Sequence, residues 1–213
     1  MEENFKELTS IREVDYDGVD QLLWVTSDHG AFGSKTDGPL FDWIDGHEMF
    51  ISQVKQFDTV VQAGGNCGMY ARFYSKYFRN VISFEPDPLN YYCLAQNCQG
   101  PQYRLFQGGL GEAPNKFSIK RLTQRNVGMH KIVEIPGEVQ MHRLDDLRLD
   151  KCDLLHLDIE GYEEKALRGS IETIERHRPV IITERSSGEN YLYEIGYKQF
   201  AKLKWDTVFV FDK

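Results

Sequence analysis

Residues 57–68 constrain the fold most, because they join a run of strand-forming residues to three glycines within five positions. Val60 and Val61 favour a buried strand, and the glycines allow a tight turn and a close approach of the backbone to a ligand. Apolar residues then recur at three- to four-residue spacing as far as Phe78, which predicts a helix. A strand, a glycine turn and a helix start present free N–H groups to an electron-rich ligand. The alternative is a turn that binds nothing.

Glu85 is the second indication of a ligand, since it ends the next expected strand, residues 80–85, and lies 21 positions after Gly64. A carboxylate about 20 residues beyond such a turn can accept hydrogen bonds from a ribose diol. Alternatively, Glu85 is a surface residue before a helix that Asp87 caps and Pro88 begins. The combination of strand, turn, helix, strand and carboxylate favours a nucleoside-type ligand.

The spacing of the turn, Gly64-x-Asn66-x-Gly68, differs from the G-x-G-x-x-G pattern of dinucleotide sites. Asn66 stands where a pyrophosphate needs a glycine, and this mixed polar surface suits an amino-acid tail with its own carboxylate and ammonium. The spacing therefore favours S-adenosylmethionine (SAM) over NAD as the cofactor. An NAD-dependent oxidoreductase remains the alternative from another enzyme class.

Strands and helices alternate from residue 57 onward, which predicts an α/β fold around a parallel sheet. The expected strands of the sheet are residues 57–62, 80–85, 103–107, 152–158 and 178–184, followed by a hairpin of 197–203 and 205–211. At about 115–143, apolar and polar residues alternate between turn signals, which predicts an antiparallel insertion into the core domain, 57–213. Residues 1–56 are expected to form a cap on the same domain, with a strand at 21–26.

The rest of the cap is expected to be a loop at 27–40 and then a helix that packs across the domain. The loop is either solvated surface or a lid, in which Phe32 and Trp43 would cover a substrate.

The composition, 41% hydrophobic and 27% charged over 213 residues, is typical of a soluble globular protein of one domain. The net charge of −8 argues against a nucleic-acid partner, which needs a basic footprint. No apolar run approaches the roughly 18 residues of a membrane helix, and the polar N-terminus lacks the features of a signal peptide. A cytoplasmic protein with no membrane partner is therefore expected, and no oligomeric state is indicated. Four cysteines without a C-x-x-C pair favour reduced thiols over a zinc site: Cys67, Cys93, Cys98 and Cys152.

Several short motifs occur in order along residues 57–211. They are Gln62–Gly68 (QAGGNCG), Phe84–Pro86 (FEP), Leu144–Leu147 (LDDL), His156–Glu163 (HLDIEGYE), Leu167–Gly169 (LRG) and the run from Arg178 to Glu184. On these motifs the chain resembles FkbM-family class I SAM-dependent methyltransferases. The resemblance implies a Rossmann-like fold with a mostly parallel seven-stranded sheet and a C-terminal antiparallel hairpin strand. It also implies methyl transfer from SAM to an oxygen acceptor, a sugar or glycan hydroxyl.

The resemblance also assigns the parts of the cofactor. Glu85 and Pro86 would lie at the ribose, Gln107 and Gly108 at the adenine, and Asp158 near the methyl group unless it only caps the following helix. The turn that would hold the methionine end consists of Gln62, Gly64, Gly65, Asn66 and Gly68.

The sequence departs from the family pattern at two positions. Gln62 replaces an acidic residue, so the turn keeps a carbonyl acceptor but lacks a charge. His156 replaces a lysine, and it is either a base that faces the pocket or a histidine buried in the core. These departures keep open a third alternative, a SAM-binding module without catalysis.

A hydroxyl acceptor must lose its proton during methyl transfer, so a nearby base assists the reaction. The candidates are Asp158, His156 and Glu160, in that order. Alternatively, Asp158, Glu160 and Glu184 could hold a divalent cation that orients a diol, although we expect no metal.

Overall fold

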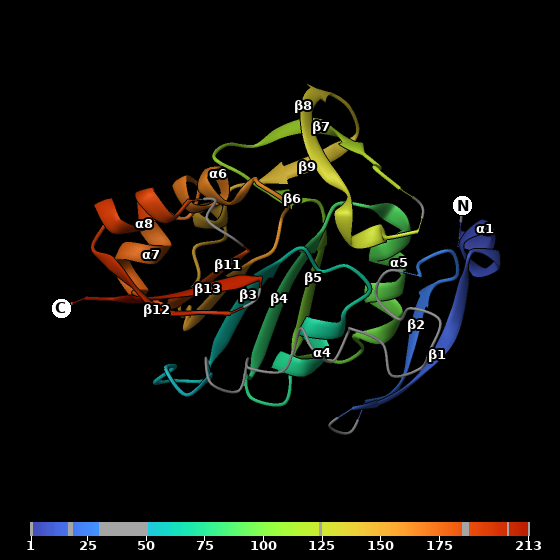
Figure 1. The fold of residues 1–213 in the computed structure, drawn as a ribbon, viewed down its shortest axis with the longest axis horizontal. Coiled ribbons are helices and arrows are strands. Elements are labelled where there is room, and N and C mark those ends of the chain that lie inside the picture. Colours follow the sequence, from blue (N-terminus) through green and yellow to red (C-terminus); the bar gives the residue numbers. More distant parts are fainter. Residues whose placement is uncertain are drawn as a thin grey trace.

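The computed structural model describes residues 2–16, 19–29, 51–123, 125–184, 188–203 and 205–212 (Figure 1). Phe32, Trp43 and nearly all of the expected lid and cap helix lie outside the described residues.

Seven strands form the central sheet, in the order β12-β13-β11-β10-β3-β4-β5. Their bounds are β3 (Thr59–Ala63), β4 (Asn80–Glu85), β5 (Tyr103–Gln107), β10 (Leu154–Leu157), β11 (Val180–Glu184), β12 (Tyr197–Lys202) and β13 (Asp206–Phe211). The first five in chain order are parallel, whereas β13 runs antiparallel to β11 and β12 antiparallel to β13. The expected mostly parallel sheet with a C-terminal antiparallel hairpin is confirmed. The strand order reverses at β3, next to β10, which is where open α/β sheets bind ligands.

Helices cover both faces of this sheet (Figure 1). The helices are α4 (Met69–Tyr74), α5 (Pro88–Asn97), α6 (Glu163–Arg168), α7 (Ile171–His177) and α8 (Glu189–Glu194). Alternate residues of each strand point to opposite faces, so Val60 packs with the side chains of α4 and α5 while Val61 packs with those of α6 to α8. None of the described helices is both long and apolar enough to cross a membrane.

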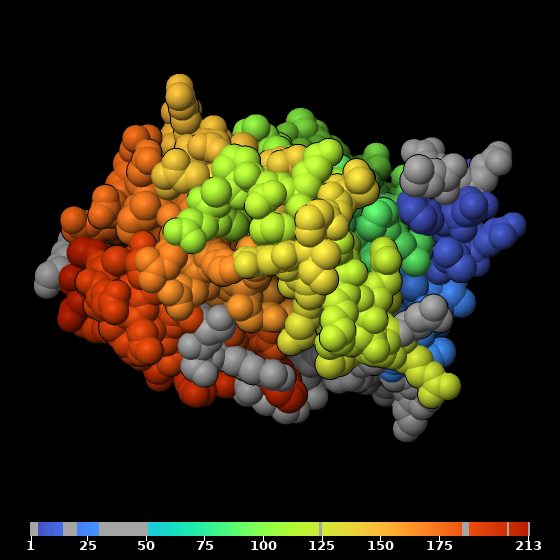
Figure 2. Space-filling view, turned by 90° about the horizontal axis from the view of Figure 1, so that it is seen from above, coloured from blue at the N-terminus to red at the C-terminus, as the bar shows by residue number. Residues whose placement is uncertain are grey.

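A second, four-stranded sheet stands above the carboxyl ends of the parallel strands and lies across the face seen in Figure 2. Its strands are β6 (Gly109–Leu110), β7 (Asn115–Lys120), β8 (Lys131–Pro136) and β9 (Val139–His142). β7 runs antiparallel to both β8 and β9, as expected for this region, whereas β6 pairs with β9 in parallel. Two short 3₁₀ helices accompany it, η1 (Val127–Met129) and η2 (Leu144–Leu147). We call residues 109–142 the insertion.

The N-terminal segment contains a short helix α1 (Glu2–Glu7) and an antiparallel hairpin of β1 (Thr9–Tyr16) and β2 (Val19–Val25). Only β2 was expected, because the polar residues of β1 do not alternate with enough apolar ones. The hairpin packs on α5, where the side-chain amide of Asn97 donates to the carbonyl of Leu23 at 2.8 Å and accepts from its N–H at 2.7 Å. Leu22 and Trp24 are buried against Cys67, Cys93 and Val127. The hairpin thus reaches both the glycine turn and the insertion.

Candidate active site

A cavity of about 390 Å³ opens at the carboxyl ends of β3, β4, β10 and β11. The ends of the core strands and the turns that follow them supply much of its wall. η1 and the start of β8 form the side nearest the insertion, and Trp24 reaches the cavity from the N-terminal hairpin. The acidic, basic and amide side chains on its walls are Asn66, Glu85, Asn90, Asn126, His130, Lys131, Asp158, Glu160, Glu184 and Asp206.

The glycine turn after β3 is shaped by its contacts within the protein. Gly64 has φ +88°, and a Cβ placed there would lie 1.9 Å from the carbonyl oxygen of Asp158, so only glycine fits. The N–H groups of Gly64 and Gly65 both donate to the carbonyl of Phe84, at 3.0 and 2.8 Å, and that of Gly68 donates to Gly65. Most of the N–H groups that the sequence pattern would offer to a ligand are therefore used internally. The turn mainly shapes the cavity wall.

Gln62 supports this turn from below, because it is fully buried and is not among the described residues that line the cavity. Its Nε2 donates to the carbonyl of Gly64 at 2.6 Å, and its Oε1 accepts from the hydroxyl of Ser83 at 2.6 Å. The side chain thus organises the turn without a charge and without direct access to a ligand.

Glu85 lines the cavity at the end of β4 and is almost fully buried. One carboxylate oxygen accepts from the N–H of Asn66 and the other from the N–H of Asp87, both at 2.7 Å. Burial nevertheless raises the pKa of Glu85 to about 8, against the lowering effect of these two hydrogen bonds. Pro86 lines the same wall.

Gln107 and Gly108, expected at the adenine, are not among the described lining residues, and Gly109 and Leu110 line the cavity instead. Gln107 is exposed at the end of β5. Gly108 packs on β9, since a Cβ there would lie 2.4 Å from the carbonyl oxygen of Gln140. The strand pairing of the insertion shifts the lining by one or two residues, which the sequence pattern does not reveal.

Four carboxylates gather at the opposite end of the cavity: Asp158, Glu160, Glu184 and Asp206. Asp158 and Glu184 lie at or just beyond the carboxyl ends of adjacent parallel strands. Asp206, the first residue of β13, pairs with Glu184 of β11. Burial and then the charges of Glu184 and Asp206 raise the pKa of Asp158 well above its usual value. Burial and the charge of Glu184 raise the pKa of Asp206 to about 7. Glu160 lies 3.4 Å from the ammonium of Lys131.

His156, one of the three candidate bases, is fully buried in the central strand β10, on the face that α4 covers, and is not among the described residues of the cavity wall. Its Nδ1 lies 2.9 Å from the hydroxyl of Tyr74, and the ring of Tyr70 packs against it at a centroid distance of 4.8 Å. This geometry agrees with the alternative of a core histidine.

Several lining residues were not singled out by the sequence, among them Trp24, Asn90 and His130. Asn90 follows the helix cap Asp87 by three positions, and His130 follows the turn residues Asn126-Val127-Gly128. The sequence thus indicated a helix start and a turn at these places, but no contact with a ligand. No group of three or more His, Cys, Asp and Glu side chains within the described residues has the geometry of a metal site. All four cysteines are buried and free.

Comparison with known proteins places this geometry in a family. The model of the FkbM methyltransferase domain matches residues 62–201, well over half of the chain. The chain belongs to the FkbM methyltransferase domain family. A search of curated protein sequences gave no significant match.

Solved structures resemble this FkbM domain at low sequence identity. The methyltransferase FkbM from Methylobacillus flagellatus KT is 17% identical with a TM-score of 0.50, and the match covers 82% of this chain but 54% of that one. The chain thus spans about half the length of that relative. A precorrin-8W decarboxylase from Methanobacterium thermoautotrophicum is 12% identical (TM-score 0.47; 79% and 89% covered). A SAM-dependent methyltransferase from Aquifex aeolicus is 10% identical (TM-score 0.47; 82% and 93% covered). The fold is that of class I methyltransferases. When the seven strands of the central sheet are numbered 1 to 7 in chain order, starting at β3, they lie in the order 3-2-1-4-5-7-6.

Proposed function

We propose that this FkbM domain binds SAM and transfers its methyl group to an oxygen acceptor, a sugar or glycan hydroxyl. The acceptor class follows from the family resemblance, and the net charge of −8 favours a small molecule or glycan over a nucleic acid. The observation that carries the choice of cofactor is the excess of acidic over basic side chains in the cavity wall.

Five carboxylates line the cavity among the described residues, whereas Lys131 and His130 are the basic side chains there. SAM brings an ammonium and a sulfonium beside its own carboxylate, and these positive charges favour the ionised forms of the carboxylates in the wall. NAD brings a pyrophosphate with two negative charges, which oppose that ionisation. The electrostatics therefore support SAM over the NAD-dependent alternative.

The size and polarity of the cavity also fit SAM. A volume of about 390 Å³ lies within the range of small-molecule and cofactor sites, ~300–1,000 Å³. Glu85 offers carboxylate oxygens to a ribose diol at one end. The buried Oδ1 atoms of Asn66 and Asn90 lack a hydrogen-bond partner within the described residues, and buried polar atoms are normally paired. These groups fit the donors of a nucleoside.

SAM supplies a methyl group activated on a sulfonium sulfur. Asp158 would take the proton of the acceptor hydroxyl, because it lies at the acidic end of the cavity that suits the positive charges. Its raised pKa falls when a cation lies nearby, since an opposite charge favours the ionised form. Glu160 would position the acceptor beside Lys131. His156 would only support the wall from the core.

The first test is calorimetric titration with SAM and S-adenosylhomocysteine, with NAD as the control. Tight binding of NAD without any response to SAM would refute the proposal. Transfer of a labelled methyl group to a panel of sugars and glycans then separates an enzyme from a non-catalytic SAM-binding module.

Asp158→Asn should lower the rate of methyl transfer by about 10²–10⁴-fold, the usual contribution of a general base. Its affinity for S-adenosylhomocysteine should change far less. Glu164→Gln, which alters an exposed carboxylate of α6 outside the described cavity wall, is the matched control and should retain the full rate. Full activity of Asp158→Asn would exclude Asp158 as the base.

A further inference from the structure

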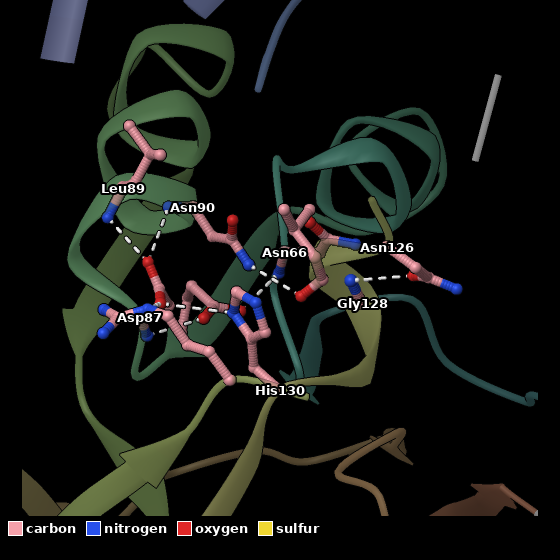
Figure 3. A network of polar contacts seen from close by, with 10 residues as sticks. Asn66, Asp87, Leu89, Asn90, Asn126, Gly128 and His130 are labelled. Atoms are coloured by element: carbon pink, nitrogen blue, oxygen red, sulfur yellow. Dashed lines mark hydrogen bonds and ion pairs between the residues drawn. The ribbon is translucent and has the colours of Figure 1, made fainter. Parts of the chain in front are cut away.

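His130 is a buried histidine of the insertion and lines the cavity. Figure 3 shows its ring beside Asp87. Its side chain is 8% exposed, and its Nε2 has no hydrogen-bond partner within the described residues. The Oδ1 atoms of Asn66 and Asn90, also in the cavity wall, are buried and unpaired as well. Three unpaired buried polar groups thus occur in one part of the wall, although such groups rarely stay unpaired in proteins.

Asp87 fixes the orientation of His130. Its Oδ2 lies 3.2 Å from Nδ1 of His130 and 2.7 Å from Nε of Arg121. Its Oδ1 accepts from the N–H groups of Leu89 and Asn90 at the start of α5. Burial alone would raise the pKa of Asp87, but His130 and Arg121 lower it to about 2. The carboxylate lies at ion-pair distance from Nδ1 without hydrogen-bond geometry. The tautomer with its proton on Nδ1 leaves Nε2, on the other side of the ring, as an acceptor.

The position of His130 is the nucleoside end of the cavity. The N–H of Asp87 donates to the carboxylate of Glu85 at 2.7 Å, so His130 and Glu85 contact the same short segment. The neighbouring helix η1 docks on this end too, because the amide of Asn90 donates to the carbonyl of Val127 at 3.2 Å. Figure 3 shows His130 between Asp87 and Asn66.

We propose that His130 is a positioning residue for the adenosine part of the cofactor. Its Nε2 accepts a hydrogen bond from a donor of the adenosine, either a ribose hydroxyl or the 6-amino group of adenine. Asn66 and Asn90 offer further acceptors on the same wall. This inference rests on the proposed SAM binding, and it gives the insertion a direct role in holding the cofactor.

Calorimetric titration of S-adenosylhomocysteine into His130→Phe tests the proposal. The variant lacks one hydrogen bond to the ligand and leaves the ligand's buried donor unpaired. Binding should therefore weaken about tenfold or more. His130→Gln, whose Oε1 can replace Nε2 as the acceptor, should recover part of the affinity. His177→Phe is the matched control. His177 lies on α7, outside the described cavity wall, and hydrogen-bonds to the carbonyl of Leu149. This variant should bind S-adenosylhomocysteine like the wild type.

Ligand analogues distinguish a hydrogen bond from a structural effect. The 2′-deoxy, 3′-deoxy and 6-oxo analogues of S-adenosylhomocysteine each lack one candidate donor. The wild type should discriminate against one of them, and His130→Phe should lose that discrimination. Equal affinity of His130→Phe and wild type for S-adenosylhomocysteine, or unchanged discrimination in the variant, would overturn the role of His130 alone. If the wild type does not bind S-adenosylhomocysteine, the proposed function fails with it.

Discussion

Opposing influences act on the carboxylate of Glu85. Two backbone N–H groups donate to it at 2.7 Å and favour its ionised form, whereas burial favours the neutral form and raises its pKa to about 8. In the folded protein Glu85 is therefore mostly protonated at neutral pH. A bound ribose diol would donate to the ionised form and so reverse this balance.

The affinity for S-adenosylhomocysteine should therefore rise with pH up to about 8, and binding at neutral pH should release protons. Titration calorimetry in two buffers of different ionisation enthalpy measures this release. Asp206, with a pKa of about 7, adds to the release when positive charge binds beside it. Glu85→Gln should remove one part and Asp206→Asn the other. Affinity that is flat between about pH 6 and 8, without proton exchange, would contradict the prediction.

Among single residues, the sequence pattern located polar groups better than it predicted their partners. Glu85 lines the cavity at the end of its strand as expected. Whether Gln62 and His156 point to the ligand or away from it could not be inferred, because Ser83 and Tyr74, which bond to them, come from other elements. His130 had no sequence signal beyond a turn, since its role depends on Asp87, 43 positions earlier in the chain.

At the scale of elements, the turn between β3 and α4 packs directly against the residue that follows β10. A Cβ at Gly64 would meet the carbonyl of Asp158 at 1.9 Å and would also require φ +88°. Gly161 has a similar φ of +97°, but nothing lies within 4 Å of its Cβ position. A substitution at Gly161 therefore introduces conformational strain alone, whereas one at Gly64 adds a steric clash.

Gly161→Ala should lower the free energy of unfolding by about 1–2 kcal/mol, the cost of a left-handed conformation for a residue with a Cβ. Gly64→Ala should cost more than this, because β3 and β10 must also move apart, and it should weaken cofactor binding. Urea denaturation of both variants measures the difference. An equal loss of stability in the two variants would show that the turn can yield without affecting its neighbour.

The regular elements were predictable because their signals are local. β4 and β5 have the expected bounds, and Asp87 caps α5 with Pro88 at its first position. β1 was not predictable, because it obtains its place by pairing with β2, and β2 in turn packs on α5. The antiparallel pairing of β7 with β8 and β9 followed from alternation. The position of this four-stranded sheet above the cavity could not be predicted, because it depends on contacts between distant segments.

For the whole molecule, the cavity joins three parts that are distant in the sequence. Trp24 of the N-terminal hairpin, the glycine turn of the core and η1 of the insertion all line it. Val127 and Trp24 also belong to one buried cluster with Cys67 of the turn. A ligand that fills the cavity therefore contacts all three parts, and it should stabilise them together by its binding free energy.

Hydrogen exchange with and without saturating S-adenosylhomocysteine should show this coupling. We expect slower exchange in β2, in residues 63–68 and in η1 together, because opening any of these segments would expose the bound ligand. α7 contributes no described residue to the cavity wall and serves as the internal control, with little change in its exchange. Protection confined to residues 63–68 and β4 would mean that the hairpin and the insertion only border the site. In that case His130→Phe should leave the affinity unchanged, so the two experiments check each other.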